Sequence, residues 1–103
     1  LTLTDGSTIS WDVSTDPIAK VTLAGNRTLA APSNGLGNGQ YISILVIQDG
    51  TGSRTLTWNA VYEFASDTAP TLTTTASKGD LFTFRYNGAK WIEVGKNLAL
   101  TLS

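Results

Sequence analysis

The segment Tyr41–Gln48 (YISILVIQ) carries apolar side chains at nearly every position. Successive side chains of a β-strand point to opposite faces. One face would therefore carry Ile42, Ile44 and Val46, and the other Tyr41, Leu45 and Ile47. A buried aliphatic side chain contributes about 1.5–3 kcal/mol, and whole domains are stable by only about 5–15 kcal/mol. Both faces therefore need a cover.

One face of this strand can pack into the domain core. The other face can be covered in either of two ways. A loop of the same chain could fold over it, or another copy of the chain could pack against it. In a chain of 103 residues the second cover is the favoured hypothesis, because a small domain has little sequence to spare for a second layer. We therefore expect an oligomer with Tyr41, Leu45 and Ile47 at the subunit interface.

Apolar and polar residues alternate with a period of two along several other segments. Alternation of this kind is found at 8–13, 20–23, 55–58 and 82–86. Strict alternation is typical of a half-buried strand, and no segment shows helical spacing. The sequence predicts an all-β protein, a small antiparallel β-sandwich or jelly-roll-like domain over residues 1–103. Because it begins with Leu1 rather than Met, we expect a fragment of a longer protein.

Short turn motifs separate the predicted strands. Asn87-Gly88 lies between two alternating segments and is a strong hairpin signal, because both residues accept the positive φ of a type I′ turn. Asp5-Gly6 and Gly25-Asn26 are expected to join neighbouring strands. In the turn that starts at Asp49, we expect the carboxylate to pair with Arg54.

The residue composition disfavours an enzyme. The chain has no His and no Cys, so a Ser-His-Asp or Cys-His arrangement cannot form, and no thiolate metal site is available. We expect no catalytic residue, no metal and no cofactor. The formal charge is −1 with no basic stripe, which disfavours nucleic-acid binding, and no apolar run is long enough to span a membrane.

Two segments are too long to be simple turns, residues 32–40 (PSNGLGNGQ) and 59–70. Long ordered loops often carry function, although each could equally be a crossing between sheets. Aromatic rings beside polar groups are typical of sugar-binding surfaces. The predicted receptor-binding residues are Asn34, Asn38, Tyr62, Phe64 and Trp91. Trp58, at the end of a strand, is expected in the core.

Glu63 and Asp67 are the one acidic pair that could serve a carboxylate glycosidase, which needs two carboxyl groups flanking a sugar. The alternative is that both are solvated loop charges. The second interpretation is favoured, so the chain is predicted not to be an enzyme.

An ordered series of motifs runs through most of the chain. It consists of 21–29 (VTLAGNRTL), 31–34 (APSN), 44–58 (ILVIQDGTGSRTLTW), 70–72 (PTL) and 80–84 (DLFTF), followed by a hairpin ending near Trp91. Together, over residues 13–94, they resemble a module of tail-fibre proteins from tailed phages and prophages. The resemblance implies a small trimeric β-domain of a virion fibre or receptor-binding protein, in contact with other virion proteins and without a cofactor.

The leading functional hypothesis is thus a virion module that trimerises and adheres to a host-surface glycan or protein. Three alternatives stay open: a decoration or spacer domain that contacts only viral proteins, a free-standing carbohydrate-binding module, and a carboxylate glycosidase that uses Glu63. Oligomeric state, binding to intact host cells and turnover discriminate among them.

Overall fold

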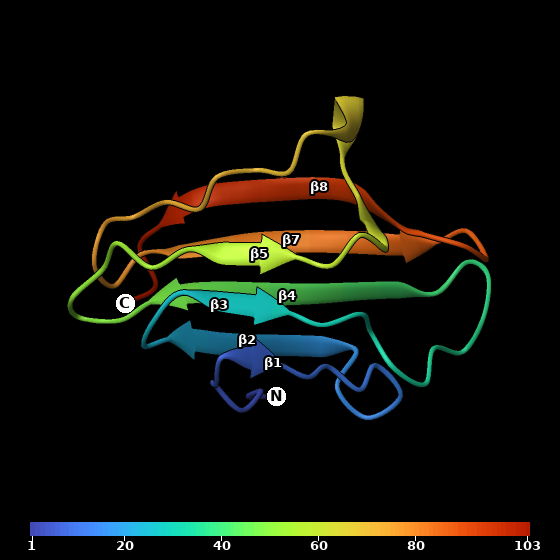
Figure 1. Ribbon diagram of the computed structural model, residues 1–103, viewed down its shortest axis with the longest axis horizontal. Helices are drawn as coiled ribbons and strands as arrows, with labels where there is room; N and C mark the ends of the chain where they lie inside the picture. Colours follow the sequence, from blue (N-terminus) through green and yellow to red (C-terminus); the bar gives the residue numbers. More distant parts are fainter.

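The computed structural model describes residues 1–103, which form eight β-strands and one short 3₁₀ turn (Figure 1). The strands are β1 (Thr8–Ile9), β2 (Ile18–Leu23), β3 (Arg27–Leu29), β4 (Tyr41–Gln48), β5 (Leu56–Trp58), β6 (Tyr62–Glu63), β7 (Gly79–Tyr86) and β8 (Trp91–Leu100), and the turn is η1 (Ala65–Asp67). The predicted all-β class is confirmed. The structure has no helix long and apolar enough to cross a bilayer.

The strands build two sheets, and the chain passes from one to the other at each step up to β5. The three-stranded sheet has the order β1-β3-β5 and is parallel throughout. The five-stranded sheet has the order β2-β4-β7-β8-β6, in which β4-β7 and β7-β8 are antiparallel and the other two pairs are parallel. Figure 1 shows the shorter sheet in front of the longer one. The arrangement is solenoid-like.

The prediction of an antiparallel sandwich or jelly roll is therefore wrong in its topology. The turn at Gly25-Asn26 connects β2 to β3, which lie in different sheets, so it is a corner and not a hairpin. Asp5-Gly6 was expected to join a first strand to the strand that follows it. The segment before Asp5 instead bridges to β2, through a parallel pairing of Thr2 with Lys20. Period-two alternation reveals that a strand is half-buried, but it carries no information on the direction of its neighbour.

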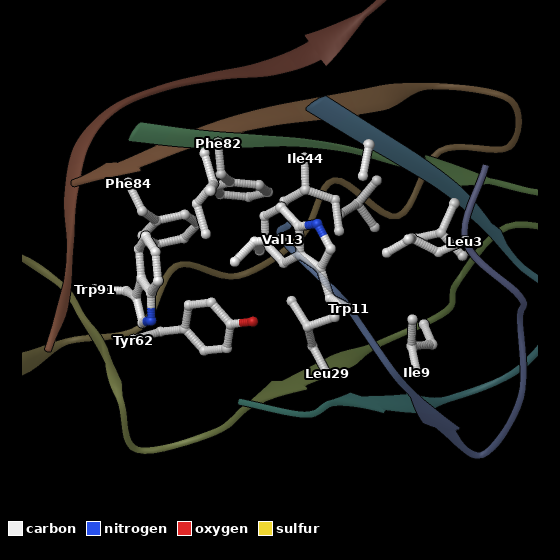
Figure 2. Close-up of a cluster of buried hydrophobic side chains, with 14 of the residues drawn as sticks. Leu3, Ile9, Trp11, Val13, Leu29, Ile44, Tyr62, Phe82, Phe84 and Trp91 are labelled. Carbon is white, nitrogen blue, oxygen red and sulfur yellow. The ribbon is translucent and has the colours of Figure 1, made fainter. Parts of the chain in front are cut away.

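The parallel sheet aligns equivalent side chains from one strand to the next. Ile9 pairs in register with Leu29, and Leu29 with Trp58. Ile9 and Leu29 are fully buried, and Trp58 packs against the same core. Figure 2 shows Ile9 and Leu29 directed at the side chains of the longer sheet. This inward ladder forms one wall of the hydrophobic core.

Strand β4 has the two apolar faces that its sequence predicts. Its inward residues Ile42, Ile44 and Val46 are buried. On the outward face, Tyr41 is 59% exposed, while Leu45 and Ile47 are half-buried. Part of that cover comes from the same chain, because Leu102 and Leu45 both approach the α-carbon of Gly79. Self-cover is thus partial, and the subunit interface stays a prediction.

The predicted hairpin joins β7 to β8, but its turn is not the expected type I′, because Gly88 has a positive φ of 95° and Asn87 does not. The Asn87 carboxamide oxygen accepts hydrogen bonds from the N–H groups of Ala89 and Lys90, at 2.9 and 2.7 Å. The β7-β8 pairing is irregular between Thr83 and Phe84, where β8 accommodates an extra residue. Such a bulge bends the strand locally.

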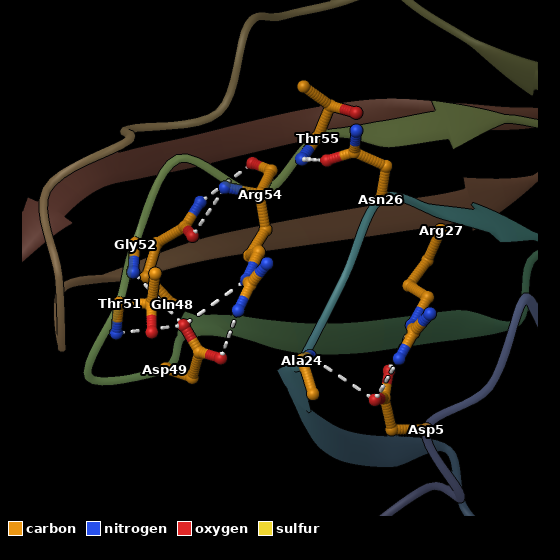
Figure 3. Close-up of polar contacts among 10 residues, drawn as sticks. All are labelled: Asp5, Ala24, Asn26, Arg27, Gln48, Asp49, Thr51, Gly52, Arg54 and Thr55. Carbon is orange, nitrogen blue, oxygen red and sulfur yellow. Dashed lines mark hydrogen bonds and ion pairs between the residues drawn. The ribbon is translucent and has the colours of Figure 1, made fainter.

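Two ion pairs lie at the end of the domain opposite this hairpin (Figure 3). The carboxylate of Asp49 accepts from the Arg54 guanidinium at 2.9 Å, which confirms the predicted pair. The carboxylate of Asp5 accepts from Arg27 at 2.8 Å and from the Ala24 N–H at 3.2 Å. Asp5 thereby ties the segment before β1 to the corner between β2 and β3.

Two buried polar side chains hold the segment after η1, which has no strand of its own. The Gln48 amide donates to the carbonyl groups of Arg54 and Thr73, at 2.9 and 2.8 Å. The Asp80 carboxylate accepts from the N–H groups of Thr73 and Ala99, at 2.7 and 2.8 Å. Since buried polar groups are costly without partners, these bonds fix where the chain returns to β7.

We expect acid to weaken the fold partly through Asp49. Hydrogen bonds from Arg54 and from the Gly52 N–H lower the pKa of this carboxyl to about 2 from 3.8. The unfolded chain then binds more protons than the folded chain between these values, so the free energy of unfolding falls as the pH falls through that window. Urea unfolding at stepped pH should show a shallower loss for Asp49→Asn. Asp16→Asn, which removes a carboxylate without an ion pair, should keep the wild-type slope.

Gly52 is predicted to be intolerant of alanine. Its φ is +75°, and a Cβ there would lie 2.7 Å from the Thr74 carbonyl oxygen and 2.9 Å from the Ala76 nitrogen. Gly52→Ala should lower the free energy of unfolding by about 2–4 kcal/mol. Gly50→Ala is the matched control, because no atom lies within 4 Å of its added Cβ, and it should change stability by less than about 0.5 kcal/mol. Equal stability of the two variants in urea would contradict this account.

Candidate functional site

The three aromatic residues predicted to contact a receptor are core residues. Tyr62 and Trp91 are each 4% exposed and Phe64 is 7% exposed, so the expectation that these rings face solvent is wrong. Tyr62 and Trp91 pair in register between β6 and β8. The Tyr62 hydroxyl donates to the Ala30 carbonyl oxygen at 2.8 Å, and burial raises the pKa of this phenol well above its usual value. Figure 2 shows both rings turned toward Phe84 and the core.

The predicted asparagines lie in solvent, at the hairpin end of the domain. Asn34 and Asn38 are exposed in the 32–40 loop, and Asn34 donates to the Asp12 carboxylate at 2.9 Å. The loop is held to the hairpin by the bond from the Gly39 N–H to the Tyr86 carbonyl oxygen, at 2.7 Å. Figure 1 shows this loop and the β7-β8 turn at the same end of the molecule. We call this surface, residues 32–40 and 87–90, the loop end.

Leu36 gives the loop end an apolar tip. Its side chain is 79% exposed, more than any other large apolar residue of the chain. It is surrounded in sequence by Gly35 and Gly37, and the Leu36 N–H donates to the Gln40 side chain at 2.6 Å. The loop is thus ordered by its own bonds while it presents an apolar group to solvent. Sequence reasoning noted the loop but not Leu36, whose lone apolar side chain between glycines was the available signal.

A small pocket of about 220 Å³ lies between β5, β6 and the η1 turn. Its walls combine aromatic rings, carboxyl groups and small side chains. It is lined by Trp58, Asn59, Ala60, Tyr62, Glu63, Phe64, Asp67 and Ala69. We call it the η1 pocket. Seven of these residues come from the 59–70 loop, which the sequence predicted to be functional or a crossing. The structure shows a loop that folds back over the core.

Trp58 is a rigid wall of the η1 pocket. Its ring meets the rings of Tyr62, Phe64 and Phe82 edge to face, with centroid separations of 5.4, 5.2 and 4.9 Å. Its position against the core agrees with the sequence prediction, but the ring is half-buried rather than sealed. The indole Nε1 is shielded from solvent and has no hydrogen-bond partner in the chain. An unpaired donor in such a place is costly.

Glu63 and Asp67 meet at the η1 pocket. The side chains face the same pocket, and the pKa of Glu63 is raised first by its interaction with the Asp67 side chain, then by burial and by the charge of Asp67. The chain brings them together through consecutive left-handed residues, Ser66 at φ 57° and Asp67 at φ 53°. Neither carboxylate forms an ion pair. Lys90, whose charge opposes the shift, donates its ammonium group to the Ala60 carbonyl oxygen at 2.8 Å.

A carboxylate glycosidase holds its two carboxyl groups about 5–5.5 Å apart in retaining enzymes and about 6.5–9.5 Å apart in inverting enzymes, so that a sugar or a water molecule fits between them. Glu63 and Asp67 line the same pocket, and the glycosidase alternative stays a prediction that an assay of turnover tests. No group of three or more acidic side chains is arranged to hold a metal ion.

The outward face of the five-stranded sheet carries the predicted interface residues. Register places Leu45 beside Lys20 on one side and Leu81 on the other, and Tyr41 beside Arg85. Next to them is a shallow hollow of about 320 Å³, lined by Leu81, Thr83, Val94, Gly95, Lys96 and Asn97. We call this surface the outer sheet face. It mixes half-buried apolar side chains with scattered charges.

We expect the contact between Glu63 and Asp67 to destabilise the fold at neutral pH. The raised pKa of Glu63 means that the folded chain binds its proton more tightly than the unfolded chain does, so this contribution favours folding as the pH falls toward 4.5. Glu63→Gln, which keeps a neutral hydrogen-bonding group, should raise the free energy of unfolding at pH 7, and the gain should vanish below 4.5. Urea unfolding at both pH values tests this.

The reciprocal variant supplies the control for that measurement. Asp67→Asn should give a similar gain at pH 7, and the double variant should gain less than the sum of the two single variants. Additive gains would contradict a direct interaction between the two carboxyl groups.

The motif order and the all-β fold agree with a structural module. The chain matches one protein family over residues 4–91, described as "Putative phage tail fibre C-terminal domain". Neither a curated protein nor a solved structure matches it. A match over most of the chain shows membership, and with it association with other virion proteins. The chain belongs to this family of phage tail fibre C-terminal domains and is part of the virion tail appendage.

Proposed function

We propose that this domain is a trimeric, non-enzymatic attachment module of the tail fibre, which adheres to a glycan or protein on the host surface. The observation that carries the proposal is the outer sheet face, where apolar side chains lie on a surface with only partial cover from the chain itself. Tyr41 is 59% exposed and Val94 is exposed beside the half-buried Leu81. Membership of a tail-fibre family supports the same role.

The trimer contact is assigned to the outer sheet face because the opposite side of the molecule offers a poorer one. The outward positions of the three-stranded sheet are Thr8, Thr28 and Thr57, which align in register. Hydroxyl side chains gain little from losing water, whereas leucine and valine gain about 25 cal/mol for each Å² buried. Subunits that pack through Leu45, Leu81 and Val94 would cover the outward face of β4.

The host contact is assigned to the loop end. Leu36 supplies an exposed apolar group, and the exposed Asn34, Asn38 and Asn87 supply hydrogen-bonding groups around it. Binding surfaces typically combine a few apolar contacts with polar groups that fix orientation. The loop is ordered by bonds to the hairpin and to Gln40, which reduces the entropy lost on binding.

A spacer or decoration domain is the second candidate. The mixture of charges with apolar residues on the outer sheet face is equally compatible with contact to other viral proteins. A spacer would not bind intact host cells, so cell binding separates the two roles.

The trimer is tested by light scattering over a range of protein concentrations. We expect the mass of three chains for the wild type, and monomers for Val94→Lys and Leu81→Lys, because three lysines brought together would have to be desolvated. Thr57→Lys, on the outward side of the three-stranded sheet, is the matched control and should remain trimeric. A wild-type protein that stays monomeric at every concentration would remove the trimer from the proposal.

Adhesion is tested with fluorescently labelled domain and intact host cells. Leu36→Ser and Asn38→Ala should lower the bound fraction about tenfold if the loop end is the contact, since each removes about 1–2 kcal/mol of binding free energy. Thr22→Ala, on the exposed side of β2, should bind as the wild type does. Trimeric protein that does not bind host cells would favour the spacer role.

A further inference from the structure

Three features of the η1 pocket point to a ligand. The pocket is open, the half-buried Trp58 ring forms a wall of it, and two acidic side chains on its rim have no cationic partner. Two negative charges at one rim are unfavourable, which agrees with the pKa of Glu63 being raised by the neighbouring Asp67. A ligand that donates hydrogen bonds to these carboxylates would relieve this cost.

We propose that the η1 pocket is a subsite for a single neutral sugar residue, a hexose or N-acetylhexosamine unit of a surface glycan. This inference rests on the proposed attachment function and locates a glycan contact on it, separate from the loop end. The size agrees: at about 220 Å³ the pocket is smaller than the roughly 300–1,000 Å³ of sites for drug-sized molecules. One ring can enter, and a longer glycan would continue outside.

The chemistry of the walls selects a polyhydroxyl ligand. A sugar ring has an apolar face that stacks on an aromatic ring, and hydroxyl groups that donate to carboxylates. Trp58 provides the ring, and its contacts with Tyr62 and Phe64 hold it in place before a ligand arrives. Glu63 and Asp67 provide acceptors.

Asn59 adds a donor to the same rim. Its side-chain oxygen accepts from the Val61 N–H at 3.0 Å, which fixes the carboxamide and leaves its exposed NH₂ group to a ligand oxygen. The rim thus presents both acceptors and a donor, which is the complement of a sugar hydroxyl.

The charge of the rim sets the specificity. Two carboxyl groups next to each other repel sugars that carry a carboxylate or phosphate, because a third negative charge would be brought into the same small space. Lys90 offsets this charge only in part, because its ammonium group lowers the pKa of Glu63 by less than the other causes raise it and forms no ion pair with either carboxylate. The pocket therefore accepts neutral sugars and rejects acidic ones.

The test is a saturation-transfer NMR screen of the purified chain with methyl glycosides of glucose, galactose, mannose and N-acetylglucosamine, and with N-acetylneuraminic acid as the acidic probe. We expect millimolar binding of at least one neutral glycoside, as is usual for so few contacts, a shift of the Trp58 indole proton, and no binding of the acidic sugar. Binding of the acidic probe at equal strength, or no response to any neutral glycoside, would overturn the assignment.

Variants locate the binding. Glu63→Gln should weaken it about tenfold, because a charge-assisted hydrogen bond is replaced by a neutral one. Ala69→Leu should abolish it by filling the pocket, since Ala69 is on the lining. Ala65→Leu is the matched control: it is exposed in η1 but outside the lining, and should bind as the wild type does. Wild-type affinity in Glu63→Gln and Ala69→Leu would place any sugar elsewhere.

The cell-binding measurement keeps the two proposals apart. If the wild-type domain binds host cells and Ala69→Leu binds equally well, the attachment function is supported and the sugar subsite is contradicted. If the wild type binds neither cells nor glycosides, both fall.

Discussion

The register of the parallel sheet is the constraint on which the rest of this domain depends. It places Ile9, Leu29 and Trp58 one above another, so each rung buries its side chain against the rung before it and against the five-stranded sheet. A slip by one residue would turn all three outward. Because the ladder ends at Trp58, the loop that follows it must close the open side of the core, and it does so with Tyr62 and Phe64. The η1 pocket is a product of that closure.

Local sequence signals predicted local structure well. Alternation gave the strands, Asn87-Gly88 gave the hairpin, and Asp49 paired with Arg54 as expected. The path of the chain was not predictable in the same way. A corner such as Gly25-Asn26 and a hairpin turn use the same residues, and only the pairing of distant strands distinguishes them. Tail-fibre membership, by contrast, was readable from the order of the motifs.

The candidate sites were predictable only in part, for a related reason. Sequence reasoning found the loop at residues 59–70 but could not tell which of its rings face inward, because β6 pairs with β8 from far along the chain. Tyr62 and Phe64 are consequently core residues, and they line the η1 pocket together with Trp58, which was assigned to the core. Glu63 and Asp67 reach the same pocket because two residues in η1 have a left-handed backbone conformation. The residue types at Ser66 and its neighbours do not predict that conformation.

The long strands β4, β7 and β8 lie along the longest axis of the domain, between the loop end and the opposite end with its two ion pairs (Figure 1). Hydrogen bonds between antiparallel strands run across that direction. A tensile force along this axis would therefore load many of them together in shear, instead of peeling them apart one after another. A domain built this way resists extension along one direction, a property that the proposed attachment role would require of an appendage pulled by a displaced particle.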